Sequence, residues 1–321
     1  MSGEARYRAG LHRYAVVLAA ATAALVFAGG LVTSTGSGLS VPDWPLSFGT
    51  LMPPMRGGVL FEHGHRMLAT TVGLLTIGLV VWLLRREPRG WVRRLGVAAL
   101  GLVVLQGVLG GLTVLLKLPT IVSVAHAGTA ELFLCLTAGI AVVTSRGWIE
   151  APAPLPDRGT PSLRALATLA AVVVYGQILL GALVRHSGAG LAIPDFPLAF
   201  GRLVPPFDSR LVAYHFAHRV GALVTVACVG WLVARVLRER AAVAALRRPA
   251  LLLLVLVAFQ VFLGALTVWS RKAVVPTTLH LLTGALILVT TLVLALRTRR
   301  LLAPALARAD ARRALVETPA T

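Results

Sequence analysis

Four histidines occupy matched places in two copies of one sequence pattern. His65 and His126 belong to the first copy, and His218 and His280 belong to the second, about 150 residues further on. Each lies inside an apolar stretch, where a polar side chain is costly and therefore marks function by default. Because two histidines on different helices at one depth can face each other across a metal, each copy predicts one metal site.

The residue types favour haem iron over zinc. Zinc sites prefer close ligand clusters with thiolates or carboxylates, and neither histidine pair has a thiolate near it in the sequence. Haem iron takes axial histidines and buries a large apolar ring, which suits helices rich in Leu, Val and Ala. Glycines within the spans leave room for a flat ring or for close helix packing; they are Gly107, Gly110, Gly111, Gly128, Gly264 and Gly284.

An arginine directly follows one histidine of each pair. These are Arg66 and Arg219. In one interpretation each guanidinium pairs with a propionate carboxylate of a haem. In the other, each side chain only extends to the membrane interface.

The two copies differ at a position that bears on chemistry. The first reads EHGHR and the second HFAHR, so Glu62 precedes His65 by three residues where His215 precedes His218. Residues three apart share a helix face, so a carboxylate is directed at the first site only. An acid–base group belongs where chemistry happens, which predicts a reactive first half and a permanent redox cofactor in the second. Alternatively, Glu62 is an interfacial anion near a helix N-terminus.

Other polar residues in the spans receive weaker interpretations. His63 points about 200° away from His65 on a helix, so both cannot bind one metal. Glu131 is a second intramembrane carboxylate whose role the sequence leaves open. Three glutamines inside spans are predicted to hydrogen-bond between helices; they are Gln106, Gln177 and Gln260.

The elements that position these residues are membrane-spanning helices. Hydrophobic residues make up 57% of the chain, charged residues 13%, and the mean hydropathy is +0.83. Apolar runs of about 20 residues cross the hydrocarbon core as helix. We therefore predict an all-α polytopic membrane protein with eight spans, at 14–34, 62–84, 95–116, 121–143, 164–185, 211–234, 249–269 and 275–296.

The net charge of +19 indicates topology rather than nucleic-acid binding. Most arginines fall on one side of the eight spans, in the N-terminal segment, in three alternate connections and in the tail. This bias predicts cytoplasmic termini in the cell membrane, with the histidines toward the outer face. The same charges contact anionic lipid, and no basic domain is present to bind nucleic acid.

Four spans per copy predict two four-helix bundles in a parallel internal repeat, because an even number of spans returns the chain to its starting side. We divide the chain into a first half, 1–144, a cytoplasmic linker, 145–162, a second half, 163–297, and a basic cytoplasmic tail, 298–321. The reactive site is expected in the first half and the permanent redox cofactor in the second.

The outer loop of each half repeats as well. Residues 36–54 read GSGLSVPDWPLSFGTLMPP and residues 188–206 read GAGLAIPDFPLAFGRLVPP. Proline, glycine and aromatic residues favour a compact, ordered loop. Such a loop is a structural cap, a lid over the cofactor, or both.

The combination of E-x-x-H-R at Glu62–Arg66, a second H-R pair at His218, and histidines at 126 and 280 over eight spans resembles the haem A synthase family. The resemblance covers about residues 14–296. It implies oxidation of the C8 methyl of haem O to the formyl of haem A, with water as the oxygen source. It also implies that His65 and His126 frame the substrate and that Glu62 is the important carboxylate.

By the same resemblance, His218 and His280 are axial ligands of a haem b that relays electrons to an unidentified acceptor. The implied partners are haem O synthase, cytochrome oxidase assembly factors and the lipid bilayer. Some family members carry a cysteine pair in the first outer loop, but residues 35–60 here contain none. The alternatives are a di-haem b-type electron carrier, which would not need the Glu62/His215 difference, and a haem transporter.

Overall fold

The computed structural model describes residues 6–157 and 159–304, and it confirms the predicted all-α membrane fold. Within these residues eight helices are long and apolar enough to cross a membrane. They begin up to five residues before the predicted spans, because the helices continue past the apolar core into their polar flanks. Their bounds are α1 Ala9–Ser34, α2 Gly58–Arg86, α3 Gly90–Leu115, α4 Thr120–Val143, α6 Leu163–His186, α7 Arg210–Glu239, α8 Ala244–Trp269 and α9 Val274–Leu301.

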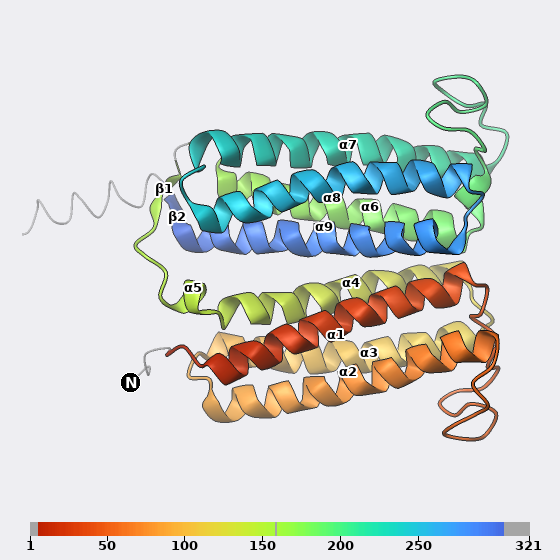
Figure 1. The fold of residues 1–321 in the computed structure, drawn as a ribbon, viewed down its shortest axis with the longest axis horizontal. Helices are drawn as coiled ribbons and strands as arrows, with labels where there is room; N and C mark the ends of the chain where they lie inside the picture. The colour runs from red at the N-terminus through yellow and green to blue at the C-terminus, as the bar shows by residue number, and fades with distance from the viewer. Residues whose placement is uncertain (1–5, 158, 305–321) are drawn as a thin grey trace, which may run out of the picture.

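The helices form two groups of four that lie side by side, α1–α4 and α6–α9 (Figure 1). Each group has its own buried cluster of apolar side chains. Contacts between the groups run through α1, α4, α6 and α9. This arrangement fits the expected parallel repeat.

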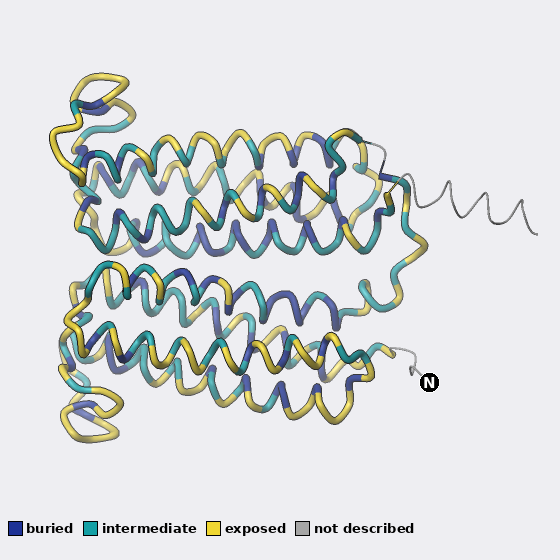
Figure 2. Tube along the Cα trace, turned by 180° about the vertical axis from the view of Figure 1, so that it is seen from behind, coloured by how far each residue is buried: buried dark blue, intermediate teal, exposed yellow. Residues whose placement is uncertain are grey.

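The buried residues turn toward the interior of each group, while exposed positions follow the outer faces (Figure 2). Many of these exposed positions carry large apolar side chains, such as Leu223 at 71% and Leu74 at 65% exposure. A monomer in water rarely presents so much apolar surface. These faces therefore suit contact with lipid.

The two long loops lie at the same end of the molecule, which we call the loop end, and the N-terminus and the linker lie at the opposite end (Figure 1). The linker contains the short helix α5, Arg146–Ile149, and the strand β1, Leu155–Asp157. β1 pairs in parallel with β2, Leu302–Pro304. Strands of three residues are too short to show a period, and the sequence analysis missed them. The expected tail lies outside the described residues from 305 onward.

The linker also sets the start of α6. Asp157 accepts hydrogen bonds from the backbone N–H groups of Leu163 and Arg164. The Ser162 side chain accepts from the N–H of Ala165, as an N-cap residue does. These bonds satisfy the first amides of the helix that carries part of the second site.

Candidate functional site

The four histidines lie at one depth, near the loop end. Each is six to eight residues after the start of its helix, in α2, α4, α7 or α9. The second and fourth helices of each group therefore supply the histidine pair. In the second half the structure brings the two predicted histidines together, and in the first half the two histidines lie at equivalent places on their helices.

In the second half the two rings face each other. The centroids of His218 and His280 lie 6.4 Å apart, with an interplanar angle of 77°. A metal between two imidazoles lies about 2 Å from each nitrogen, which itself lies about 1 Å from its ring centre, so the centroids should be about 6 Å apart. The observed spacing fits one metal held between these two rings, as in a haem with two axial histidines.

Every one of the four rings rests against a glycine of the preceding helix. A Cβ built on that glycine would lie 3.0–3.3 Å from the ring Cε1, tighter than ordinary contact. The pairs are Gly29 with His65, Gly110 with His126, Gly181 with His218 and Gly264 with His280. We call these four glycines the seats of the imidazoles, because each leaves the space that one ring occupies.

The sequence analysis singled out Gly110 and Gly264 only as sources of space, and it missed Gly29 and Gly181. The repeat itself held the signal, because Gly29 and Gly181 occupy equivalent places before the two long loops. Which glycine contacts which histidine depends on how the helices pack, and the sequence alone does not show that packing.

Several ring nitrogens lack a protein partner. Among the described residues, Nδ1 of His65, of His126 and of His280 is buried without a hydrogen bond. Buried polar atoms are normally paired, so each exception needs an explanation. Imidazole nitrogens left in this way suit coordination of a haem iron, and the donor set in both halves fits that group.

The predicted glutamines do bridge helices, but differently in the two halves. Gln177 in α6 donates from Nε2 to the His218 carbonyl at 2.8 Å and lies 3.0 Å from Nδ1 of the same residue. Gln260 lies 3.4 Å from the His280 ring. Gln106 donates instead to the His126 carbonyl and to a threonine. Only the second half places an amide against its rings.

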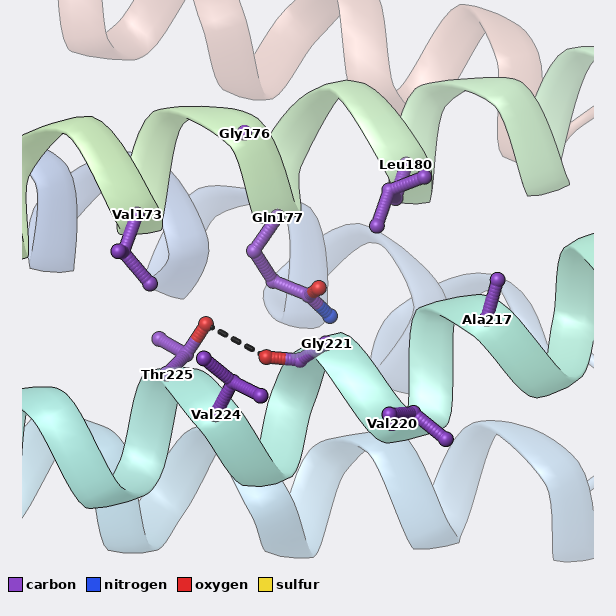
Figure 3. Close-up of a pocket in the computed structure, with 9 residues that line it drawn as sticks. All are labelled: Val173, Gly176, Gln177, Leu180, Ala217, Val220, Gly221, Val224 and Thr225. Carbon is purple, nitrogen blue, oxygen red and sulfur yellow. Dashed lines mark hydrogen bonds between the residues drawn. The ribbon is translucent and has the colours of Figure 1, made fainter.

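A groove beside His218 opens between α6 and α7 (Figure 3). Its cavity volume is about 470 Å³, and its lining is apolar apart from Gln177 and Thr225. Gly221 forms part of the wall. A larger residue would not fit there, because its Cβ would collide with the Gln177 amide oxygen. Leu68 stands at the equivalent place in the first half.

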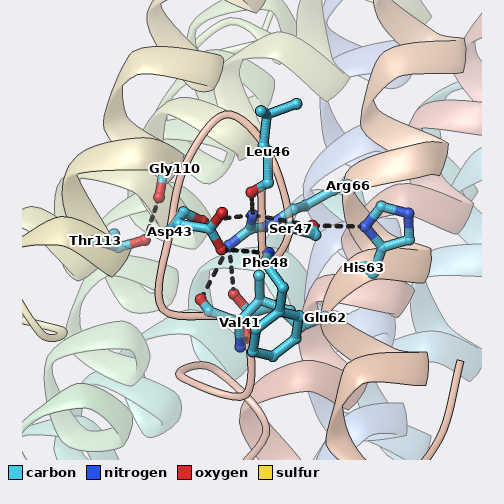
Figure 4. Close-up of polar contacts among 10 residues, drawn as sticks. All are labelled: Val41, Asp43, Leu46, Ser47, Phe48, Glu62, His63, Arg66, Gly110 and Thr113. Atoms are coloured by element: carbon cyan, nitrogen blue, oxygen red, sulfur yellow. Dashed lines mark hydrogen bonds and ion pairs between the residues drawn. The ribbon is translucent and has the colours of Figure 1, made fainter. Parts of the chain in front are cut away.

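Glu62 faces the loop above the first histidine pair. It is 4% exposed. One carboxylate oxygen accepts from the Val41 N–H at 2.9 Å, and the other pairs with Arg66 at 2.7 Å (Figure 4). In the second half, Nδ1 of His215 accepts from the Ile193 N–H at 3.2 Å. Both residues anchor their loops, and what differs between the halves is the negative charge.

Arg66 and Arg219 bind the loops as well. Arg66 donates to the carbonyls of Val41, Asp43 and Leu46. Arg219 donates in the same way to three carbonyls of the second loop. The terminal nitrogens of both guanidiniums are therefore engaged by backbone, and propionate binding by these two arginines stays a prediction.

Each loop is closed by an aspartate at its tip. The Asp43 carboxylate accepts from the N–H groups of Phe48 and Gly49, at 2.7 and 2.9 Å. Asp195 repeats this arrangement in the second loop. The bonds from Gly49 and then Phe48 hold the pKa of the Asp43 carboxyl below its ordinary value, because they stabilise the ionised form. The loops are thus ordered caps.

The first loop covers a polar contact that has apolar residues at the equivalent places of the second half. Ser47 Oγ lies 2.8 Å from Nδ1 of His63, which is 6% exposed. Nε2 of His63 is buried without a partner among the described residues. In the second half Ala199 and Phe216 take these places, in an apolar cluster. The sequence analysis gave His63 no role and missed Ser47.

Glu131 lies buried in α4, and its Oε2 has no hydrogen bond within the described part of the chain. The nearby Tyr175 hydroxyl donates to the Gly128 carbonyl and so joins α4 to α6. Both cysteines, Cys135 and Cys228, are free and partly buried among apolar side chains. They pack as small apolar residues.

Known proteins share this sequence over most of its length. The chain matches the COX15-CtaA family model, described as cytochrome oxidase assembly protein, over residues 12–60 and 57–293. It is 39% identical over 247 residues to the heme A synthase of Symbiobacterium thermophilum, covering 74% of this chain and 79% of that protein. The heme A synthase of Caulobacter vibrioides is 31% identical over 335 residues, covering 88% of this chain and 94% of that protein.

Proposed function

This chain belongs to the COX15-CtaA family of cytochrome oxidase assembly proteins, and on that premise we propose that it is a haem A synthase. It oxidises the C8 methyl group of haem O to the formyl group of haem A, with water as the oxygen source. Its relatives named heme A synthase support this assignment. The reaction takes place in the membrane, with the loop end toward the outer face.

One observation supports different roles for the two halves. Both halves hold an imidazole pair seated on glycines, but among the described residues the first half alone adds a carboxylate and a serine–histidine contact under its loop, where the second half has His215, Ala199 and Phe216. These groups form one polar network, which joins Glu62, Arg66, Ser47 and His63. Water and released protons need polar partners, so the oxidation belongs in the first half.

In the first half, His65 and His126 orient the haem O substrate, with its apolar tail left toward lipid. In the first round the methyl carbon loses two electrons and two protons, and water adds to give the alcohol. A second round gives the hydrated aldehyde, which loses water to leave the formyl group. Glu62 stabilises positive charge that develops near the methyl carbon or takes up a proton, since it keeps its carboxylate among hydrogen-bond donors.

In the second half, His218 and His280 would hold haem b, which supplies one-electron transfer when bound. Gln177 fixes the orientation of the His218 ring from α6, and second-shell contacts of this kind tune a metal site. Phe216 and Ala199 belong to an apolar cluster under the second loop, so no serine–histidine pair is available there to move a proton. The protein thereby separates the reacting carbon from the electron relay.

A second candidate is a di-haem electron carrier. The near-identical glycine seats of all four rings favour it, because they would suit two resident haems. An electron carrier, however, would have no use for the polar network around His63 and Glu62. Haem analysis separates the two functions.

The decisive experiment expresses the chain in membranes that make haem O but lack haem A, with an electron acceptor present. Extracted haems are identified by chromatography and mass spectrometry. Haem A or its hydroxymethyl intermediate is the expected product, whereas haem b beside untouched haem O would support the carrier.

Variants at Glu62 then test the first half. Glu62→Gln keeps an acceptor for the Val41 N–H but removes the charge, and Glu62→Ala removes both. Both should stop haem A formation while haem b stays bound. Full activity in Glu62→Gln would reduce Glu62 to a loop anchor, and loss of haem b in either variant would refute the separation of roles.

A further inference from the structure

Arg185 is a partly buried cation at the border between the two halves. Its Nη2 donates to the Gly30 carbonyl and to Ser34 Oγ, both at 2.8 Å. Its Nε is buried with no hydrogen-bond partner among the described residues. The ion pairs in the described part of the chain do not include it. An unpaired buried charge is costly, so this guanidinium calls for an anion.

The position of Arg185 relates it to the second histidine pair. Gly181, the seat of His218, lies one turn earlier on α6. Ser34, which accepts from Arg185, also accepts from the Thr278 hydroxyl at 2.9 Å, and Thr278 precedes His280 by two residues. Arg185 and Thr278 both lie between the histidines and the loop end, where the chain becomes polar.

Among the described residues, Arg185 is the one loop-end arginine with a buried nitrogen that lacks a partner. Arg66 and Arg219 donate their terminal nitrogens to loop carbonyls. Arginines with an unpartnered buried nitrogen also occur at the opposite end of the bundle, but far from the histidines along their helices; they are Arg164, Arg235 and Arg240. The first half has Thr33 where the second has Arg185.

We propose that Arg185 binds a propionate carboxylate of the haem held by His218 and His280. This inference rests on the proposed function, since it presupposes haem b in the second half. A guanidinium offers several donors in a rigid fork that matches a carboxylate, and charge-assisted bonds of this kind are the strong ones. The Gly30 and Ser34 bonds occupy Nη2 and leave the other guanidinium donors without a bond to the described residues.

The test compares haem b with its dimethyl ester, which keeps the iron and the ring but has no carboxylates. Full-length protein made in haem-deficient membranes is loaded with either form, and the rate of haem loss to apomyoglobin is measured. Wild type should retain haem b about tenfold longer than the ester, since a hydrogen bond to a charged group is worth about 1.5–3 kcal/mol. Arg185→Leu should lose this preference, and Arg185→Lys should keep part of it.

Ser34→Ala is the matched control. It removes a hydrogen-bond acceptor of Arg185 but leaves the cation, so the preference for haem b should persist. If Ser34→Ala abolishes the preference for haem b over its ester as fully as Arg185→Leu does, Arg185 only holds the two halves together. If Arg185→Leu does not fold, the Arg185→Gln variant makes the same comparison with a neutral side chain of similar length.

The outcomes also separate this inference from the proposed function. Wild-type protein that binds neither haem form would refute haem b in the second half. Wild type that binds both forms equally well, or Arg185→Leu that keeps the preference, would overturn the role of Arg185 alone. A change confined to haem O turnover, with haem b retention unaltered, would assign Arg185 to the first half and overturn the proposal.

Discussion

Replacing Gly181 with alanine should displace the His218 ring and weaken haem b binding without unfolding the protein. The added Cβ would lie 3.0 Å from the ring Cε1, whereas carbon atoms at their optimum lie about 3.5–4.0 Å apart. The ring must therefore move by about half an ångström. It cannot do so freely, because Gln177 contacts both its Nδ1 and its backbone carbonyl.

The magnitude follows from the cost of overpacking. Inserting a methyl group into a well-packed site costs about 1–3 kcal/mol, which corresponds to roughly ten- to a hundredfold weaker haem binding. Alanine favours a helix over glycine by about 1 kcal/mol, so the fold itself should not lose stability. The effect should be local to the site.

The assay is haem b content per protein after purification, together with the visible spectrum of the reduced form. Gly176→Ala, on the same helix, is the control, because its Cβ would meet no atom within 4 Å. Gly29→Ala should instead leave haem b in place and impair haem O oxidation, since Gly29 seats His65. A wild-type haem b content in Gly181→Ala, or an equal loss of haem b in Gly176→Ala, would refute the role of Gly181 in positioning the His218 ring.

Two further predictions concern the first loop. Asp43→Asn keeps only one acceptor for the Phe48 and Gly49 amides, so these amides should exchange hydrogen faster by mass spectrometry. In the wild-type protein, donation from Gly49 and Phe48 lowers the pKa of Asp43. Its contribution to the stability of the loop should therefore be complete above the ordinary carboxyl pKa and be lost progressively as pH falls from there through the lowered pKa. Protection of the two amides that stays constant across this range would contradict this. The double variant Ser47→Ala with His63→Phe copies the second half. If the pair moves protons, haem A formation should slow by roughly a hundredfold or more, with haem b content unchanged. Unchanged turnover would make this pair structural.

Local sequence properties were enough to predict the fold class. Apolar runs of the right length predicted eight spans, and the helices of the structure contain them with small differences at their ends. The histidines stood out for the same reason, since a polar side chain in an apolar run is visible without any knowledge of packing. The repeat then paired His65 with His126 and His218 with His280.

The directions of side chains could not be predicted in this way. Glu62 was expected to act at the first site or to be an interfacial anion, and neither interpretation included its bond to the returning loop at Val41. Arg66 was expected to pair with a propionate or to extend to the interface, and neither interpretation included its bonds to loop carbonyls. A loop that folds back over a helix end brings hydrogen-bond acceptors to that end, and the helical periodicity of the sequence does not predict them.

By itself, then, the sequence determined the membrane class, the duplication and the four imidazoles, because hydropathy and spacing are properties of single segments. Only the tertiary structure decided which glycine seats which ring, which half keeps a polar network under its loop, and where Arg185 lies. These depend on the rotation of each helix about its axis and on contacts such as Arg185 with Gly30 and Ser34, more than 150 residues apart. Such contacts form only when the two halves pack together.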